Sequence, residues 1–461
     1  MRQLVIFFST FSKICLFFLS LVFVFTGCVR DNTLPMDKEI ETYLNHHTLE
    51  LWYPKVKDEK HGGFLSQFTY DWQLEGPQYK FSVTQARNVW SCSRAFEFYP
   101  EKKIYLNMAK HGFIFLRDVM WDKEFGGFHQ TLTREGNLID EKHMDEKRSY
   151  GNAFCIYALA AYYRVSHDEE VLNLAKKSFH WFDEHAHDDE YKGYFQFLYR
   201  DGTPIPRSVL PEYNAGDRAH VGLKDYNSSI HILEAYTELY QVWPDDLLRT
   251  RLEEMYFLVL DTMVNPTGYL RLHFFPDWTE VSDEDLKGEA GRRSIYANHV
   301  TFGHDVETAY LLLEAAHVLG LEIDGQLMGR FKRLLDHSIE KGWDKENGGF
   351  YDMGIYRDGE MEIINDHKSW WGQAEGLNSL LLMHTLYPDD PHNYYELFTQ
   401  MWDYIKTYLI DDQYRGWYDS GLDKNPGSKK RNKADLWVVN YHTTRSLINC
   451  IEMLRREEGY K

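Results

Sequence analysis

Three histidines stand near the beginnings of mostly apolar stretches of the chain: His231, His304 and His442. A lone histidine is usually structural, but three at equivalent positions favour a chemical role. Histidine ordinarily titrates near neutrality, with a pKa of about 6.5, so it can both remove and return a proton. The three residues therefore predict acid and base chemistry.

Other polar and aromatic residues occur at the beginnings of similar apolar stretches. An unpaired polar group is costly to bury, so polar residues in these stretches indicate a site. In chain order they are Arg87 and Trp90; Arg148, Tyr150 and Asn152; Asn227; Glu307; Trp370, Trp371, Gln373 and Glu375; and Trp437 and Arg445. We expect them to line one pocket together with the histidines.

A short glycine-containing motif occurs six times and sets the register of these stretches. Its copies end at Phe64, Phe128, Phe195, Leu270, Phe350 and Tyr418. Successive copies are between 64 residues (from 64 to 128) and 80 residues (from 270 to 350) apart. That period exceeds the roughly 20 to 50 residues of common solenoid repeats and suits a unit of two helices joined by turns.

Each unit contains two kinds of predicted helix. Apolar residues at three- and four-residue spacing predict outer helices over 171–182, 248–264, 326–339 and 394–409. Stretches that are apolar around most of the circumference predict inner helices over 84–98, 152–163, 227–240, 305–319, 371–386 and 441–454. Six such pairs predict an all-α fold, the (α/α)6 barrel or six-hairpin toroid, with short β-hairpins in the connecting loops. All inner helices would then begin at one end of the axis.

Composition limits the classes of partner. The chain has 461 residues, 43% of them hydrophobic, and no Pro/Gly/Ser-rich linker, so we expect a single domain over residues 37–461. Its net charge is −20 without a basic block, which makes nucleic acid an unsuitable partner. Cys92, Cys155 and Cys450 are scattered and form neither a disulfide framework nor a metal-binding spacing.

The N-terminus has the pattern of a signal peptide. Arg2 and Lys13 precede an apolar run over residues 14–25, which is too short to span a bilayer. Small residues before Cys28 resemble the bacterial lipobox, so residues 1–28 are expected to be a lipoprotein-type signal peptide and residues 29–36 a short tether. An ordinary secretory peptide is the alternative. Either predicts the periplasmic side of a bacterial membrane, with a lipid on Cys28 as the only membrane contact in the first case.

The expected pocket suits a carbohydrate, because sugars present apolar faces to aromatic rings and hydroxyls that need several oriented partners. The sequence contains neither a phosphate-binding loop nor a dinucleotide fingerprint. The C2 proton of an open-chain aldose is acidic because it lies next to the C1 carbonyl. A base on one face can remove it to give an enediolate, and an acid on the other face can return a proton with inverted configuration. His304, His442 and an arginine that stabilises the oxyanion fit these roles.

A metal site is the main alternative use of the histidines. His231 and Glu234 are three residues apart, as are His304 and Glu307, so each pair shares a helix face. Two such pairs could form a site of the di-iron bundle type, but that design needs two further glutamates on facing helices. We therefore expect neither a metal ion nor another cofactor.

Five segments resemble motifs of the acylglucosamine 2-epimerase and cellobiose 2-epimerase superfamily. They are residues 87–90, 227–236, 303–307, 370–375 and 437–445, in this order along the chain. The resemblance implies an (α/α)6 barrel that epimerises a reducing-end sugar through a cis-enediol without a cofactor. It implies that His304 and His442 are the acid/base pair and that His231 assists ring opening or binds the sugar. Arg87 and Glu307 would hold the C1 and C2 oxygens or tune His304, and the substrate-binding set would further include Tyr150, Asn227, Trp371, Glu375 and Trp437.

Several alternatives remain at the level of sequence. Val438 and Asn440 stand where cellobiose-type members commonly have Lys and Pro, so the substrate stays open between a cellobiose- or mannobiose-type disaccharide, mannose and an N-acylglucosamine. An aldose-ketose isomerase would use the same enediolate but return the proton to C1. A glycoside hydrolase on the same barrel would need a carboxylate pair, for which Asp225, Asp305, Glu307 and Glu375 are available. A non-catalytic sugar-binding lipoprotein is the third alternative.

Overall fold

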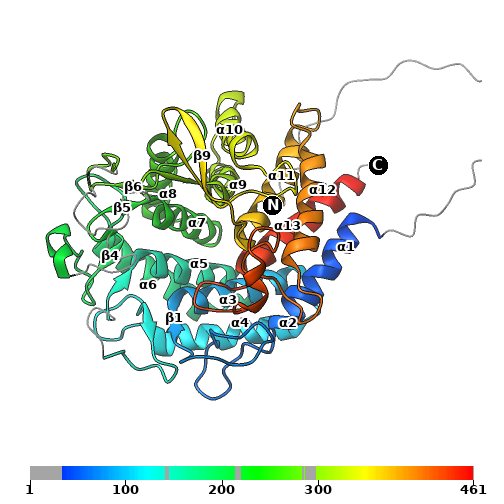
Figure 1. Cartoon of the computed structure of the whole chain (residues 1–461). Helices are drawn as coiled ribbons and strands as arrows, with labels where there is room; N and C mark the ends of the chain where they lie inside the picture. Colours follow the sequence, from blue (N-terminus) through cyan, green and yellow to red (C-terminus); the bar gives the residue numbers. More distant parts are fainter. Residues whose placement is uncertain (1–33, 141–144, 213–219, 283–284, 286–296, 460–461) are drawn as a thin grey trace, which may run out of the picture. The chain divides into compact units, whose positions relative to one another are not determined.

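The computed structural model describes residues 34–140, 145–212, 220–282, 285 and 297–459 (Figure 1). The chain divides into two units, Met1–Pro35 and Met36–Lys461, and every helix and strand below belongs to the second. The predicted signal peptide and Cys28 lie outside the described residues. Among the residues that are described, no helix has the length and apolar character needed to span a bilayer.

Six inner helices form a closed ring. They are α3 (Ser82–Phe98), α5 (Ser149–Ser166), α7 (Tyr226–Val242), α9 (Phe302–Leu319), α11 (Trp370–Leu386) and α13 (Tyr441–Gly459). Each packs against the next, and α13 packs back against α3. In Figure 1 the colours accordingly run once around the ring in sequence order. All six predicted inner helices are confirmed.

Five helices of the outer layer each follow one inner helix. They are α4 (Lys103–Phe115), α6 (Glu169–Ala186), α8 (Asp246–Phe257), α10 (Gly325–Gly342) and α12 (Tyr394–Tyr404). Three of these continue into π-helical turns, η2 (Leu116–Met120), η5 (Leu258–Met263) and η7 (Ile405–Leu409). The outer helices predicted from amphipathic spacing are present.

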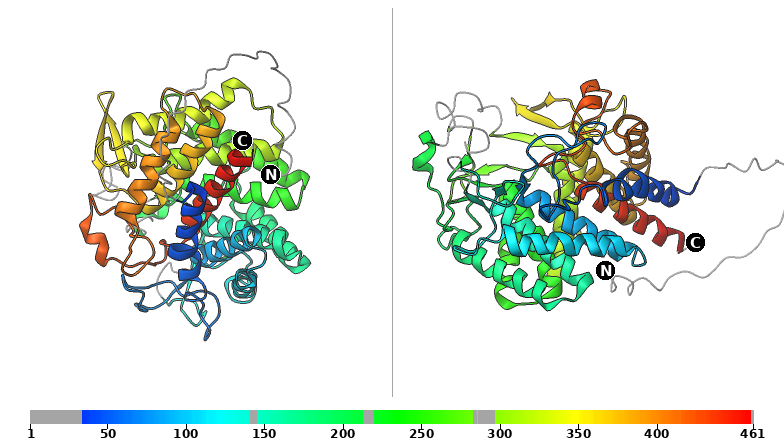
Figure 2. Two further views of the ribbon diagram at one scale, coloured as in Figure 1. Left: turned by 90° about the vertical axis from the view of Figure 1, so that its right-hand side faces the viewer. Right: turned by 90° about the horizontal axis from the view of Figure 1, so that it is seen from below.

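The N-terminal segment of the second unit supplies the sixth outer element. It comprises α1 (Met36–Tyr43), the π-helical η1 (Leu44–Leu49) and α2 (Glu50–Trp52). Both α1 and η1 pack against α13, so the first residues of this unit cover its last helix (Figure 2). Arg455 of α13 fixes this contact through Asp37 at 3.0 Å. The fold is the predicted (α/α)6 barrel.

Short antiparallel strands connect successive units. The pairs are β1 (Lys80–Phe81) with β2 (Thr131–Leu132), β3 (Lys147–Arg148) with β4 (Phe197–Leu198), and β5 (Lys224–Asp225) with β6 (His273–Phe274). The fourth sheet has three strands, β7 (His299–Thr301), β8 (Met353–Arg357) and β9 (Glu360–Asn365). The first strand of every sheet leads directly into an inner helix, so the pairing fixes where that helix begins.

The glycine-containing motifs form tight turns that contact the inner helices. Gly63 has a φ of 62°, and a Cβ atom there would lie 2.5 Å from Gln85 Oε1 and 2.8 Å from the Phe115 ring, so only glycine fits. The next residue, Phe64, donates its backbone N–H to Gln85 Oε1 at 2.7 Å. In other units Asn152 binds the N–H of Phe128 and Gln373 binds that of Phe350.

These contacts correct one sequence-based expectation. Asn152 and Gln373 were expected to line the pocket, but their amides hold the turns that precede the inner helices. The physical reason is that an inner helix buries both of its faces. A polar residue on it can therefore face the outer layer as well as the axis.

A buried lysine meets an aspartate in five of the six units. The pairs are Lys80 with Asp58 at 2.9 Å, Lys147 with Asp122 at 3.0 Å, Lys224 with Asp188 at 2.7 Å, Lys368 with Asp344 at 2.7 Å, and Lys433 with Asp411 at 2.8 Å. Each aspartate begins a glycine turn, and each lysine lies on the chain that enters the next inner helix. In the fourth unit Asn265 and His299 stand at these places. These lysine–aspartate pairs were not predicted from the sequence.

Candidate active site

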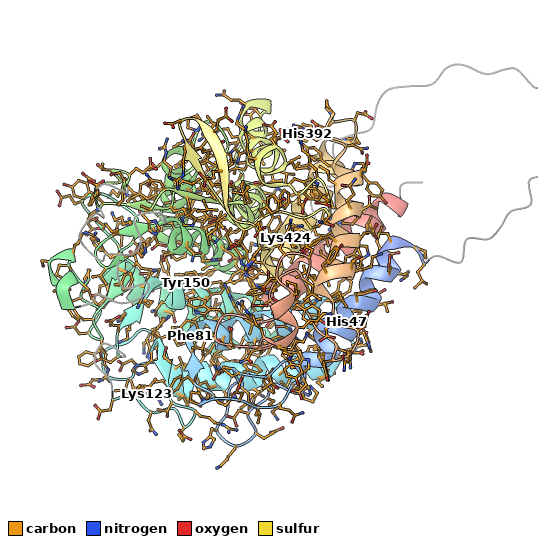
Figure 3. All side chains as sticks on the ribbon, in the orientation of Figure 1. His47, Phe81, Lys123, Tyr150, His392 and Lys424 are labelled. Atoms are coloured by element: carbon orange, nitrogen blue, oxygen red, sulfur yellow. The ribbon has the colours of Figure 1, made fainter. Side chains whose placement is uncertain are left out.

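The predicted site residues gather where the inner helices begin. All but one lie in the first two turns of an inner helix: Arg87 (α3), Tyr150 (α5), Asn227 and His231 (α7), His304 and Glu307 (α9), Trp371 and Glu375 (α11) and His442 (α13). Trp437 lies on the loop that precedes α13. Figure 3 shows Tyr150 well inside the outline of the helices rather than at its edge.

Aromatic contacts join most of these residues into two groups, which Tyr441 and Phe154 link to each other. The Trp371 ring lies 4.8 Å from His304 and 5.6 Å from His442. On another part of the ring, Tyr150 lies 4.9 Å from His231 and 5.8 Å from Trp437. The structure thus brings together residues from five separate segments of the sequence.

Local sequence explains how Trp371 and the α7 residues are placed. Gly303, next to His304, has no side chain, and a Cβ atom there would lie 2.7 Å from the Trp371 ring. Asp225 caps α7 by accepting the Ser228 N–H at 2.7 Å. Asn227 follows in the first turn, half-buried and four residues before His231, so the two share a helix face.

His442 is held through one ring nitrogen. Its Nδ1 lies 2.7 Å from Glu375 Oε1 and 3.8 Å from Glu307 Oε1. The contact with Glu375 favours a proton on Nδ1 and leaves Nε2 as the nitrogen that can meet a substrate. Burial lowers the pKa of His442 well below its usual value, although the charge of Glu307 opposes this.

His231 is held in the same way by Glu234. Its Nδ1 lies 2.9 Å from Glu234 Oε2, and both side chains are 3% exposed. Burial alone would raise the pKa of Glu234, but the Arg445 charge and the hydrogen bond with His231 outweigh it and lower the pKa to about 2. Glu234 is therefore an ionised carboxylate that orients the His231 ring.

His304 has a different environment from the other two histidines. It is half-buried, and its Nδ1 has no hydrogen-bond partner among the described residues. Burial, followed by the nearby His231, His299 and His442, lowers the pKa of His304 to about 3. His304 is therefore neutral at pH 7 and can accept a proton.

Arg445, predicted to line the pocket but given no role there, lies at the centre of the buried charges. Its guanidinium donates to Glu234, Glu307 and Glu375, which come from three different helices, and to the Tyr441 hydroxyl. It is 2% exposed. Because Nη1 and Nη2 are both occupied and only Nε has no partner among the described residues, Arg445 chiefly neutralises carboxylates.

Arg87 is a second buried arginine close to these histidines. Its Nη2 donates to the Tyr150 hydroxyl at 2.9 Å, and its guanidinium lies over the Phe154 ring at 4.5 Å. The Tyr150 hydroxyl is thereby oriented beside His231. Of the two arginines, only Arg87 has no carboxylate partner among the described residues.

The sequence contained a signal for the Glu234 and Arg445 contacts. Both are charged residues in predicted inner helices, and each follows a predicted catalytic histidine by three residues. Residues three apart on a helix share a face, so both had to lie beside the histidines. Spacing along the sequence could not predict that Glu234 and Arg445 bind each other across the barrel.

The carboxylates do not form a favourable metal site. Glu307, Glu375 and His442 offer ligand atoms within 4.8 Å of one another. However, Arg445 donates to Oε1 of both glutamates, so a cation would have to displace a guanidinium or lie beside its charge. Glu234, required by the di-iron alternative, is bound to His231 and Arg445.

Comparison with known proteins decides the family. Residues 62–445 match the sequence profile of N-acylglucosamine 2-epimerase (GlcNAc 2-epimerase). The chain belongs to the N-acylglucosamine 2-epimerase family. A cellobiose 2-epimerase of Bacteroides fragilis is 28% identical over 423 residues, which cover 91% of this chain and 98% of the relative.

Solved structures agree with this membership of the N-acylglucosamine 2-epimerase family. A cellobiose 2-epimerase from Bacillus thermoamylovorans has a TM-score of 0.77 at 26% identity, covering 91% of this chain and 99% of that one. A D-mannose isomerase has the same TM-score of 0.77 at 20% identity, covering 91% of this chain and 100% of that one, and shows the fold alone. The chain is therefore an enzyme of the carbohydrate epimerase and isomerase class.

Proposed function

We propose that this enzyme inverts C2 of a reducing-end aldose by removing and returning the C2 proton through a cis-enediolate, without a cofactor. The observation that carries the proposal is the placement of three histidines on three inner helices around Trp371 and Tyr150. Two of them, His231 and His442, have Nδ1 fixed by a glutamate, which leaves Nε2 for the substrate. Epimerisation needs acid/base groups on both faces of one carbon, and separate helices can supply them.

His304 and His442 are assigned as the acid/base pair. Trp371 lies against both rings, at 4.8 Å and 5.6 Å, so a sugar ring that stacks on its face would lie between the two imidazoles. Neutral His304 is suited to remove a proton. His442 returns one when its ring is protonated on Nε2, a form that burial disfavours and the charge of Glu307 favours. In the reverse direction the two exchange roles.

The remaining residues are assigned to opening and holding the sugar. His231 assists ring opening, because Glu234 holds its Nδ1 and leaves Nε2 for the sugar. Arg87 and the Tyr150 hydroxyl stabilise the oxygen on which negative charge develops. Glu307, Glu375 and Asn227 complete the polar lining, and Trp437, which is 47% exposed, provides a surface for a second sugar unit.

The substrate class follows from the relatives and from this exposed tryptophan. We propose a cellobiose- or mannobiose-type disaccharide first, with mannose or an N-acylglucosamine as alternatives. The Bacteroides fragilis relative is named a cellobiose 2-epimerase, and the matching family profile is that of N-acylglucosamine 2-epimerase.

Proton exchange provides the test. The purified enzyme is incubated in D2O with cellobiose, mannobiose, mannose and N-acetylmannosamine, without added metal or nucleotide, and products are followed by NMR. We expect deuterium at C2 of one reducing sugar together with its C2 epimer. A ketose product would reassign the enzyme as an aldose-ketose isomerase. Cleavage of a glycosidic bond without exchange would contradict the enediolate chemistry.

We further propose that Cys28 carries a lipid that anchors the enzyme on the periplasmic side of a bacterial membrane. The support is the sequence pattern of residues 1–28. Metabolic labelling with a palmitate analogue should label the wild-type chain and leave Cys28→Ser unlabelled. Equal labelling of both would contradict the proposal.

A further inference from the structure

A continuous buried chain of contacts joins two of the three histidines. His231 Nδ1 lies 2.9 Å from Glu234, whose other oxygen accepts from Arg445. Arg445 Nη2 donates to Glu375 Oε1 at 2.6 Å, and the same oxygen lies 2.7 Å from His442 Nδ1. Every link is a charge-assisted contact, so the path has no gap.

We infer that Arg445 is a positioning residue that couples His231 to His442, so that protonation of one imidazole changes the proton affinity of the other. The inference rests on the proposed function for its catalytic meaning. Its physical basis is the network of contacts alone. Arg445 binds the carboxylate partner of each histidine, and it touches neither imidazole.

Burial makes such coupling strong. Glu375 is 0% exposed, Arg445 is 2% exposed, and the two histidines are 3% and 5% exposed. Charges in a poorly solvated interior are screened much less than charges in water. A proton gained at one end of the network is therefore felt at the other, through the shared guanidinium.

The charge balance of the network requires two further protons. Glu234, Glu307 and Glu375 carry three negative charges when ionised, and Arg445 supplies one positive charge. Two protons shared among the imidazoles and carboxylates would make the network neutral, which a buried cluster favours. Since the sites compete for these protons, the network should titrate as a unit.

Other charged or titratable groups face this network from every neighbouring helix. They are Arg87 from α3, Tyr150 and Tyr157 from α5, Asp225 and Tyr226 at the start of α7, His304, Tyr310 and Glu314 from α9, and Tyr441 from α13. None of them lies on the path between the two histidines as a shared ligand of both. Arg445 is the only residue among those described that binds the glutamate partners of both.

The decisive variant is Glu234→Gln, which removes a charge at the His231 end and leaves all contacts of His442 in place. The His442 resonance is titrated in 15N-histidine NMR spectra of the full chain and assigned with His442→Gln. Since a negative charge is lost from the network, we expect the His442 midpoint to fall by about half a pH unit or more. The acid limb of kcat/KM for C2 exchange should move in the same direction.

A matched control uses a second buried arginine. Glu452 pairs with Arg94 at 2.9 Å, outside the network. Glu452→Gln should leave the His442 midpoint unchanged. If Glu234→Gln and Glu452→Gln gave the same midpoint as the wild type, the coupling would be disproved.

Arg445→Lys and Arg445→Met test the hub itself. A lysine keeps the charge but cannot bind three carboxylates in the same plane, so we expect exchange to fall at least about tenfold and the midpoints of both histidines to move. If Arg445→Met does not fold, Glu234→Gln still decides the question. Because the NMR titration needs no turnover, a coupled pair in a protein without epimerase activity would refute the proposed function and support the coupling.

Discussion

Two sets of buried charges in this protein differ in their balance. At each of five glycine turns a buried lysine pairs with an aspartate, and at four of them backbone carbonyls accept from the same lysine; Lys80, for example, binds Asp58 and the carbonyls of Gly62 and Phe64 at 2.8 to 3.2 Å. Asp58 and Asp122 each bind a second cation as well, Arg134 and Arg200. At the axis, Arg445 faces three carboxylates, and Glu375 Oε2 has no partner among the described residues.

This difference distinguishes buried charges that hold the fold from buried charges that can take part in proton transfer. A buried pair of opposite charges that recurs in one unit after another holds the chain in place without an excess of negative charge. An excess of buried negative charge beside two histidines binds protons that can be transferred. The predictions below test this contrast.

The largest effect is expected from the histidines themselves. His304→Ala and His442→Ala should each lower the rate of C2 exchange by about 10² to 10⁴ fold, because each removes one acid/base group. Circular dichroism should show an intact fold. His111, which contacts the Gly63 carbonyl from the outer helix α4, is the control, and His111→Ala should keep its activity. Full activity in either axial variant would break the two-base mechanism.

At a glycine turn, we expect a large effect on stability rather than on activity. Lys80→Met leaves Asp58 with Arg134 as its remaining cation, so the free energy of unfolding should fall by about 1.5 to 3 kcal/mol. The folded fraction should keep its exchange rate. Urea titration and activity at equal folded concentration measure the two effects. Lys57→Met removes an exposed pair with Glu59 and should change stability by about 1 kcal/mol or less.

The turns should also set the response to acid. Burial opposes ionisation of Asp344, but Lys368 and backbone N–H groups outweigh it and lower its pKa to about 2. A carboxylate whose folded pKa lies below its unfolded value stabilises the fold above the unfolded pKa, and that contribution is lost as pH falls through the folded pKa. Stability should therefore decrease between about pH 4 and pH 2. Asp344→Asn should lower stability at pH 7 and flatten this decrease; an unchanged slope would contradict the assignment.

The smallest effect is expected at the exposed edge of the site. Trp437 contacts Phe81 at 4.9 Å and Tyr150 at 5.8 Å, and its remaining surface is open. Trp437→Ala should raise KM for a disaccharide by roughly three- to tenfold, in line with about 1 kcal/mol for one aromatic contact. KM for a monosaccharide should change less. Equal losses for both substrates would assign Trp437 to the reacting sugar instead.

Much of the fold could be predicted from the sequence because its signals are local. The amphipathic spacing of α10 and α12 and the apolar character of α5 and α7 arise from residues close together in the chain. The recurring glycines located the turns because left-handed backbone strongly favours glycine. The same local rules could not tell which face of an inner helix meets the axis, so Asn152 and Gln373 were misplaced.

The sequence predicted which residues belong to the candidate site, but it did not predict which of their charged groups contact one another. Periodicity placed His231, His304, Trp371 and His442 at the beginnings of their helices, as the structure has them. The sequence also determined the histidines and glutamates three residues apart on single helices, because helical geometry fixes that spacing.

Only the tertiary structure decided which charges meet. Glu234 and Arg445 are 211 residues apart in the chain and bind each other because closure of the ring brings α7 and α13 together at the axis. Likewise, His304 differs from the other two histidines solely through its neighbours. Local sequence determines helices and turns by short-range sterics and hydrogen bonding, whereas proton affinity depends on distance and burial, which exist only once the barrel has closed.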